Sequence, residues 1–532
     1  MPNENGDNST RALLKQGLVL TVAMIVVRVI GVFYRIPLTN LWGDGALGTY
    51  GDAYTVYSLF LMISSVSVPT MMSKLIGDRV ALGQYNEAKR LTRCCVILFS
   101  ALGLLGCLIM LFGSEFIAVY IFNNPDLALA IRGLAPTVLI VSFMSVFRGY
   151  FQGLSNMQPS AVSQVIESLA HALFSILLAE LLFPVGLNWS VFGGVIATGI
   201  AAVCSLIFLL WCYRRDAKSS KLGRAKASAS TESDRFLYRA ILAMILPIVL
   251  SNVIFNLKSI IDSAVFGNLM KVKGFDVETI RQMKGLYTGK FNVFLAVPIA
   301  IGDSVAAAVV PAIAGDFSLG LKKEIRRKTD SVTRTVLLIT VPASIGLAVL
   351  GKPIIKLFFP GAPLGGELFW FGSFAAAFYS VSDISTGILQ GVGKQKVPMW
   401  ISLAATVLTV ILNVLMILVF NLGIYTLPIS ILLFSFLRMI MNVAALRRLC
   451  GLRMRLPRMF GKPLAGSLFM GVCCAILYIL AFSVFGSNAL ALFAALILSV
   501  VIYFFVMINL GWLSSRDMEN IPYGKFLAYF KI

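Results

Sequence analysis

Two arginines, Arg28 and Arg35, lie within a long apolar stretch that runs from residue 13 to residue 38. An arginine at the centre of a membrane-spanning helix costs about 2.5–3.5 kcal/mol on insertion scales, so one that is kept there usually faces a polar cavity. Residues seven positions apart share one side of a helix, because seven residues make almost two turns. Gly31 lies between the arginines on that side and leaves room for a bulky group. The pair predicts a cationic, water-accessible site within the membrane.

Further polar residues interrupt apolar stretches later in the chain. Polar groups that face lipid are costly, so we expect these to line a cavity. Lys258 and Asp262 are four residues apart, so a structural ion pair and a direct substrate contact are both open. Lys290 has no acidic residue three or four positions away, which makes it the better candidate for binding an anion. The predicted substrate-binding residues are Arg28, Gly31, Arg35, Asn252, Asn256, Lys258 and Lys290.

Acidic residues within the apolar stretches are candidates for ion coupling. Asp262, Asp303 and Glu167 can each carry a proton or Na⁺, although a helix cap or an ion-pair partner is the more ordinary role for each of them. Glu167 and His171 are four positions apart and can share a proton. Coupling to Na⁺, to H⁺ and to the membrane potential all stay open. The 8 cysteines show no CxxC spacing and the sequence has 1 histidine, so we predict no metal site and no cofactor.

These residues are expected to lie on membrane-spanning helices. The sequence of 532 residues is 58% hydrophobic and 13% charged, which no soluble class matches. Windows of about 20 apolar residues, the length that crosses about 30 Å of hydrocarbon, recur along nearly the whole chain. We therefore predict an all-α integral membrane protein with fourteen transmembrane helices. The predicted spans are 13–38, 50–75, 93–113, 129–150, 158–183, 189–213, 239–267, 285–313, 333–351, 367–390, 397–421, 424–446, 464–486 and 488–511.

The net charge of +21 is explained by topology, so we predict no nucleic-acid partner. With fourteen spans and a cytoplasmic N-terminus, most Lys and Arg residues fall in cytoplasmic segments, as the positive-inside rule requires. The largest basic clusters are at 74–93, 214–239, 322–334 and 447–462, and both termini are predicted to be cytoplasmic. One predicted external loop is an exception, because it contains Lys271, Lys273, Arg281 and Lys284.

An internal repeat organises the predicted spans. The segment GYFQG at 149–153 recurs as GILQG at 387–391, and other landmarks keep a similar offset in the same order. The repeat predicts two pseudo-symmetric six-helix halves with two additional helices. The predicted domains are an N-terminal half at 1–213, a basic cytoplasmic linker at 214–238, a C-terminal half at 239–448, and two extra helices with a cytoplasmic tail at 449–532. Transporters built from such repeats carry a substrate between their halves by alternating access.

Several short motifs occur in order along the chain: VRVIGVFYR at 27–35, WG at 42–43, YG at 50–51, Pro69 with SKL at 73–75, YTGK at 287–290 and VVP at 309–311. In this order they resemble the MurJ and stage V sporulation protein B type of lipid II flippase. That type belongs to the multidrug, oligosaccharidyl-lipid and polysaccharide exporter superfamily. The resemblance extends over essentially the whole chain.

The resemblance implies transport of lipid II, the undecaprenyl-pyrophosphate-linked peptidoglycan precursor, from the inner to the outer leaflet of a bacterial plasma membrane. It implies that Arg28, Arg35 and Lys290 surround the pyrophosphate, which suits the planar fork of an arginine. It further implies a lipid-tail groove on the last two helices, and membrane lipids and the cell-wall synthesis machinery as partners.

Two other functions stay open on the same scaffold. A cation-coupled multidrug exporter would use acidic residues, and a flippase for another polyprenyl-linked oligosaccharide would use the same cations. We expect no enzymatic activity, because an enzyme acting on such lipids needs catalytic acids or bases beside the membrane and because the chain has no Walker A sequence.

Overall fold

The computed structural model describes residues 23, 26–27, 29–31, 33–154, 156–219, 234–300, 302, 322–394, 396–452 and 454–511. Within these ranges the regular structure is helical, which confirms the predicted all-α fold. Ten helical stretches in the described part of the chain are long and apolar enough to cross a membrane. The count of fourteen spans stays a prediction, since the predicted spans 13–38 and 285–313 lie partly outside the described residues.

Contacts divide the chain into unit 1, Met1–Gly285, and unit 2, Leu286–Ile532. The sequence placed 239–285 in its C-terminal half, whereas contacts group these residues with unit 1. The predicted domain boundaries follow the repeat rather than the packing, so they stay predictions.

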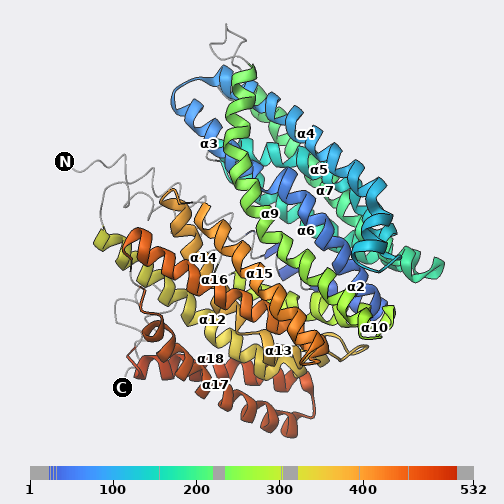
Figure 1. The fold of residues 1–532 in the computed structure, drawn as a ribbon, viewed down its shortest axis with the longest axis vertical. Coiled ribbons are helices and arrows are strands. Elements are labelled where there is room, and N and C mark those ends of the chain that lie inside the picture. The colour runs from blue at the N-terminus through green and yellow to red at the C-terminus, as the bar shows by residue number, and fades with distance from the viewer. Residues whose placement is uncertain are drawn as a thin grey trace. The chain divides into compact units, whose positions relative to one another are not determined.

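In unit 1, α5 is the central helix, since it packs against both α4 and α7, while α6 packs along α7 (Figure 1). The core joins Trp42, Tyr50 and Leu134 with residues of the neighbouring helices. The helices of unit 1 are α2 (Arg35–Leu61), α3 (Val68–Ala81), α4 (Tyr85–Phe116), α5 (Leu127–Gly153), α6 (Gln158–Leu182), α7 (Leu187–Ser219), α9 (Asp234–Val272) and α10 (Val277–Gly285), with short turns η1 (Met62–Val66), η2 (Ile117–Ile121) and η3 (Phe183–Val185).

Gly43 marks a kink inside α2, between the predicted spans 13–38 and 50–75. Its φ of 71° is in the region that favours glycine, and the backbone there is not helical. The helical path continues on both sides, so the two predicted spans are joined by a kink rather than by an open loop.

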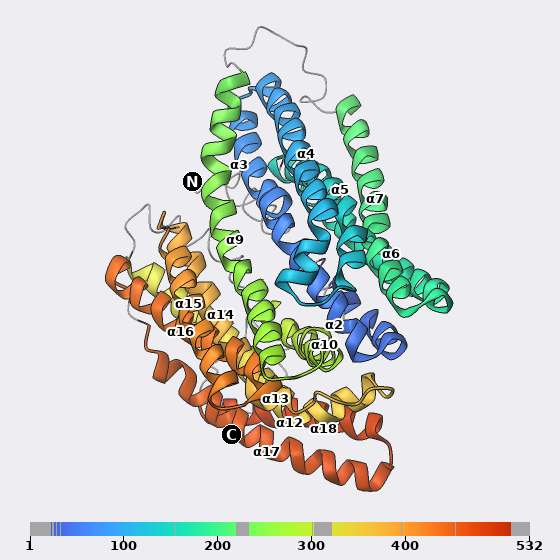
Figure 2. The same cartoon turned by 45° about the vertical axis from the view of Figure 1, so that its right-hand side comes forward.

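In unit 2, α17 and α18 pack against each other and both contact α12 (Figure 2). These two helices are the extra pair that the sequence predicted after the second repeat. The elements of unit 2 are η4 (Leu286–Phe291), α12 (Lys322–Phe358), α13 (Leu368–Gly372), α14 (Ala375–Gly391), α15 (Lys396–Leu418), η5 (Gly423–Tyr425), α16 (Thr426–Cys450), α17 (Leu456–Phe485) and α18 (Asn488–Asn509).

Corresponding helices make the same contacts in the two units. In unit 1, α5 contacts α4 and α7, and α6 contacts α7; in unit 2, α14 contacts α12 and α16, and α15 contacts α16. Gly153 ends α5 and Gly391 ends α14, at the matching ends of the repeated pentapeptides. The repeat in sequence is therefore accompanied by a repeat in helix contacts.

The segment that the sequence analysis treated as an external loop contains a helix, α10. Its apolar residues Val277, Ile280 and Met283 recur every three positions, a helical spacing that a search for long apolar windows does not detect. The helix packs on α2 at glycines: a Cβ added to Gly48 would lie 2.1 Å from the carbonyl oxygen of Arg281, and one added to Gly285 would lie 1.8 Å from that of Asp44. Only glycine permits this backbone approach.

Candidate functional site

Arg35 begins α2 and lies among tyrosine hydroxyls of unit 1. Its Nε donates to the Tyr34 hydroxyl at 3.4 Å, and that hydroxyl is 3.3 Å from the Tyr50 hydroxyl. The ring of Tyr50 is 4.5 Å from that of Tyr54, centroid to centroid. Tyr34 and Tyr50 are buried, while Arg35 and Tyr54 are half-buried. The arrangement gathers one guanidinium and several hydroxyl donors, the groups that bind phosphate oxygens.

His171 of α6 joins this cluster, which sequence reasoning instead linked to Glu167. The Tyr54 hydroxyl is 3.1 Å from His171 Nε2 and also bonds to Thr198 of α7. The Tyr34 and His171 rings meet edge to face with centroids 4.7 Å apart. Three helices therefore supply one continuous polar group, which we name the Arg35 cluster: Arg35, Tyr34, Tyr50, Tyr54, His171 and Thr198.

Glu167 lies one turn from His171 on α6 but is paired with a different residue. Its Oε2 accepts a hydrogen bond from Arg148 at 2.5 Å. Arg148 also donates to Ser163 at 3.0 Å and to Ser205 at 3.2 Å. Glu167 therefore neutralises an arginine of α5.

Unit 2 contains a second arginine–carboxylate pair, on α14 and α16. Arg438 of α16 lies 2.9 Å from Asp383 of α14 and also donates to Thr386 at 3.2 Å. Thr386 corresponds in the repeat to Arg148, and the two pairs join different helices: α5 and α6 in unit 1, but α14 and α16, the counterparts of α5 and α7, in unit 2. In unit 1 the arginine is on the fourth predicted span, and in unit 2 the acid is on its counterpart.

Lys258 and Asp262 form an ion pair within α9, and both are buried. The structure shows this ion pair, and a direct contact of Lys258 with substrate stays a prediction. The backbone of α9 also includes Asn252 and Asn256, whose side chains lie outside the description.

Lys290 is fully buried in η4, with 0% of its surface exposed. Its Nζ donates to the carbonyl oxygen of Ala362 at 2.5 Å and to that of Leu364 at 3.3 Å. The ammonium also lies 5.5 Å from the centroid of the Phe359 ring. Lys290 therefore holds the segment that follows α12.

Among the other predicted residues, Gly31 meets open space: a Cβ built on it has no described atom within 4 Å. Arg28 and Asp303 lie outside the described residues. The structure therefore brings Arg35 together with tyrosines and His171, and it places Lys258 and Lys290 in separate contacts.

Sequence reasoning missed a buried charge cluster formed by α2 and α10. Asp52 is 1% exposed, and its carboxylate accepts hydrogen bonds from Ser263 at 2.5 Å and from Lys284 at 2.9 Å. Lys284 is 3% exposed, and its ammonium lies 5.2 Å from the centre of the Phe122 ring. Asp52 and Lys284 are 232 positions apart, so no spacing along one helix could predict that they pair. The one sign in the sequence was the unusual number of basic residues in the predicted external loop.

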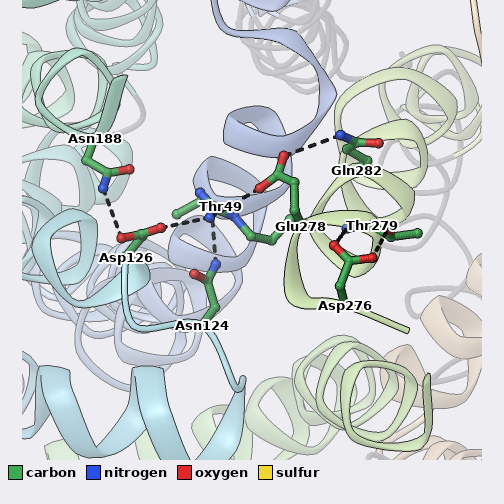
Figure 3. A network of polar contacts seen from close by, with 9 residues as sticks. Thr49, Asn124, Asp126, Asn188, Asp276, Glu278, Thr279 and Gln282 are labelled. Carbon is green, nitrogen blue, oxygen red and sulfur yellow. Dashed lines mark hydrogen bonds and ion pairs between the residues drawn. The ribbon is translucent and has the colours of Figure 1, made fainter. Parts of the chain in front are cut away.

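A second pair extends this cluster toward the α4–α5 connection. Arg281 donates to Asp126 at 2.7 Å and to Thr49 at 3.1 Å. Figure 3 shows Asn188 directed at Asp126 and Asn124 directed at Thr49. The Asn188 amide donates to the other carboxylate oxygen of Asp126 at 2.9 Å, and the Asn124 amide donates to the Thr49 hydroxyl at 3.1 Å. Asp52 and Asp126 are thus each paired with a cation of α10.

Two known family models match this chain. Residues 13–315 match the family model described as polysaccharide biosynthesis protein, and residues 288–415 match the MatE model. Lipid II flippase MurJ of Bacillus subtilis (strain 168) is 26% identical over 427 residues, which cover 76% of this chain and 77% of the relative. Stage V sporulation protein B of the same organism is 24% identical over 328 residues, covering 62% of this chain and 63% of the relative.

Two solved structures have the same fold. One is described as lipid II flippase MurJ in an inward closed conformation; it has a TM-score of 0.68 and 14% identity, with 93% of this chain and 98% of that chain covered. The other is an inward-facing multidrug resistance MATE family transporter of the MOP superfamily, with a TM-score of 0.67, 15% identity, and coverage of 81% and 97%.

These relatives are named as flippases and transporters rather than as enzymes, in agreement with the prediction from sequence. The chain belongs to the polysaccharide biosynthesis protein family; it is a multi-pass membrane protein that is similar in sequence to the MurJ flippase and shares the fold of MurJ and of a MATE transporter.

Proposed function

We propose that this protein is a flippase that moves lipid II, the undecaprenyl-pyrophosphate-linked peptidoglycan precursor, from the inner to the outer leaflet of a bacterial plasma membrane by alternating access. The observation that carries the proposal is the similarity to lipid II flippase MurJ over 76% of the chain. Its role would then be in peptidoglycan synthesis, cell-wall biogenesis and cell shape, in company with the cell-wall synthesis machinery.

The chemistry of the Arg35 cluster supports an anionic substrate. A guanidinium donates two parallel hydrogen bonds to phosphate, and neighbouring hydroxyls add neutral donors. Arg28 lies seven residues earlier in the sequence, and on a continuous helix it would share the side of Arg35. We propose that both arginines bind the pyrophosphate, and that Asn252, Asn256 and Lys258 contact the remainder of the headgroup.

Lys290 would contribute in a different conformation from the one described. In the structure its ammonium donates hydrogen bonds to the carbonyl oxygens of Ala362 and Leu364. Binding a phosphate would require exchanging these neutral acceptors for charged oxygens, which make stronger hydrogen bonds with an ammonium. We propose that this exchange accompanies transport.

Reconstituted vesicles with fluorescent lipid II in one leaflet test the proposal. The wild-type protein is expected to make the labelled lipid accessible in the other leaflet. Arg35→Gln is expected to lower the rate by about 10- to 100-fold, which corresponds to losing a charge-assisted hydrogen bond of about 1.5–3 kcal/mol. Arg132→Gln is the matched control, since Arg132 pairs with exposed Glu115. A fully active Arg28→Glu variant, or equal binding of a headgroup that lacks pyrophosphate, would contradict the proposal.

Mass spectrometry of lipids retained by the purified protein separates the lipid substrates. Retained lipid II supports the assignment. Another polyprenyl-pyrophosphate glycolipid in its place would redirect the function to that oligosaccharide while keeping the role of the arginines.

A cation-coupled multidrug exporter is the second candidate, because residues 288–415 match the MatE model. This function requires drug efflux that depends on an ion gradient, without movement of lipid II. Resistance assays on cells with and without the protein, combined with the vesicle assay, distinguish the two functions.

A further inference from the structure

One end of unit 2 gathers exposed cations from the ends of several helices. Residues 323–327 begin α12, residues 394–396 precede and begin α15, residues 447–448 lie in the last turn of α16, and residues 455–462 cap and begin α17. Together these ranges contain ten Lys and Arg residues with exposed side chains and one acid, Glu324. We call the four ranges the basic end of unit 2.

An apolar core under the basic end holds these helix ends together. It joins Ile325 of α12, Leu389 of α14, Leu446 of α16 and Leu452, and Val397 of α15 packs against it. The ranges are far apart in sequence, but their helices share this core. The ten cations therefore lie at one end of one packed unit rather than on separate loops.

Few acids neutralise the basic end. Glu324 forms an exposed ion pair with Arg327 at 3.6 Å. Asp330, further along α12, interacts electrostatically with Arg326 of the same helix and with Arg455 at the start of α17. These two carboxylates face ten exposed cations, so they leave a large net positive charge on this surface.

The basic clusters of unit 1 contain more acids. Residues 74–93 and 214–239 have thirteen cations and five acids, whereas residues 322–334, 394–396 and 447–462 of unit 2 have fourteen cations and two acids. The positive-inside rule counts Lys and Arg, and acids contribute little to it. Orientation of the spans accounts for the cations in both units, but it does not account for the scarcity of acids in unit 2.

Two helices begin at the basic end, where a cation is unfavourable. The N-terminus of a helix carries a partial positive charge, so it favours anions. Arg455 is the N-cap of α17 and its side chain makes no capping hydrogen bond, while Arg458 lies in the first turn. Lys323 lies in the first turn of α12. An anion beside these residues would be attracted by the side chains and by the helix ends together.

The position of the cations along the membrane spans favours a lipid headgroup as that anion. The apolar span of α12 begins at Lys323 and that of α15 begins at Lys396, so their charges lie where hydrocarbon gives way to headgroups. Trp400 is one turn from Lys396 on α15, and 61% of its surface is exposed. Exposed tryptophan is typical of the headgroup level of a membrane. A soluble partner does not explain an exposed indole at this depth.

We propose that the basic end of unit 2 binds anionic phospholipids such as phosphatidylglycerol, with their phosphodiester headgroups against its cations and with Trp400 at the level of the headgroups. Lys and Arg both make charge-assisted hydrogen bonds to phosphate oxygens. Ten cations spread over several helix ends suit several singly charged headgroups, whereas one pyrophosphate needs only two or three. The surface is separate from the Arg35 cluster, and the proposal does not depend on which substrate is transported.

Quenching of Trp400 by brominated lipids tests this proposal. The full-length protein is placed in phosphatidylcholine vesicles with increasing amounts of phosphatidylglycerol whose acyl chains carry bromine, which quenches indole on contact. Each protein is compared with its own Trp400→Phe counterpart, so the difference reports this residue alone. We expect phosphatidylglycerol to bind beside Trp400 about tenfold more tightly than phosphatidylcholine at low salt, because each nearby cation contributes roughly fivefold. High salt should weaken this preference, since it screens exposed charges.

Lys394→Gln combined with Lys396→Gln removes two exposed cations close to Trp400 in sequence. We expect this pair of changes to lower the preference for phosphatidylglycerol by about fivefold or more. Lys271→Gln combined with Lys273→Gln is the matched control, because it removes two exposed cations of unit 1 and changes the net charge equally. The control is expected to keep the preference of the wild type.

Arg447→Gln combined with Arg448→Gln is a second test at the end of α16, and it should also lower the preference. A wild-type preference of less than about twofold would mean ordinary contact with surrounding lipid and would overturn the proposal. An equal loss in the control would replace the site by a general attraction of the charged protein. Binding of polyglutamate by the solubilised protein, without a lipid preference, would assign the surface to an acidic soluble partner instead.

Discussion

Lys284 of α10 donates a hydrogen bond to the buried carboxylate of Asp52 in α2, across 2.9 Å and 232 positions of sequence. Both side chains are almost completely buried, at 3% and 1% exposure, and Ser263 satisfies the second carboxylate oxygen. A charge buried this deeply is tolerated only with its partner in place. The pair therefore fixes α10 on α2, immediately before the chain enters unit 2.

Lys284→Met is expected to destabilise the protein by about 3–5 kcal/mol, because it leaves the Asp52 carboxylate buried without its cation. Thermal unfolding of the purified protein in detergent measures the loss. The double variant Lys284→Met with Asp52→Asn is expected to recover most of it, since neither charge remains. Lys271→Met serves as the control, because Lys271 is exposed and hydrogen bonds to Asn123. Equal losses in the single and double variants would refute the pairing.

Gly48→Ala is expected to detach α10 from α2. The new methyl would lie 2.1 Å from a backbone carbonyl oxygen of Arg281, and backbone cannot rotate away as a side chain does. Overpacking of this kind costs about 1–3 kcal/mol, and here it also weakens the Asp52–Lys284 pair. Hydrogen exchange of α10 reports the change. Gly346→Ala in α12 is the control, since its added Cβ meets no described atom within 4 Å; equal exchange in α10 of both variants would disprove the close contact.

Glu167→Gln is expected to lower stability by about 1.5–3 kcal/mol, because it removes a charge-assisted hydrogen bond from Arg148. The double variant with Arg148→Gln is expected to lose less than the sum of the two single variants, which a double-mutant cycle measures. Transport by Glu167→Gln in vesicles should keep its ion dependence if the residue acts through this pair. Loss of that dependence at unchanged stability would instead assign Glu167 to ion coupling.

Asp276 caps the N-terminus of α10, and the strength of this cap depends on pH. Its carboxylate accepts hydrogen bonds from the Thr279 hydroxyl, at 2.5 Å, and from the Thr279 backbone N–H, at 3.0 Å, as an N-cap does. The Thr279 hydroxyl, followed by its backbone N–H, holds the pKa of Asp276 below its usual range. The folded state therefore favours the carboxylate, so the stabilisation is present above the ordinary Asp pKa of about 3.9 and is lost as the pH falls through the lowered value.

We expect the hydrogen-exchange protection of α10 to decrease between pH 5 and pH 2.5, relative to Asp276→Asn. Asparagine caps a helix without titrating, so the ratio of the two proteins cancels the intrinsic pH dependence of exchange. A ratio that stays constant over this range would show that the Asp276 cap does not contribute.

The local sequence was sufficient for the fold class, and the site residues that it marked stay predictions. Patterns within short segments carried these predictions. Apolar windows predicted the helices, and the repeated pentapeptides predicted the repeat. The two arginines of the first span marked Arg35 as a candidate binding residue. The same local signals predicted a possible pairing of Lys258 with Asp262, because residues four apart meet on one helix. They failed for α10, since its nine residues are too short and too charged for a window that detects membrane spans.

The sequence by itself determined that this chain is a helical membrane protein and which charges its spans carry. Only the tertiary structure decided the partners of those charges: Glu167 with Arg148, His171 with Tyr54, and Asp52 with Lys284. The physical reason is that each choice depends on how packed helices are rotated and on where glycine lets backbones approach. Spacing along one helix says which residues share a side of it, but not which helix lies opposite.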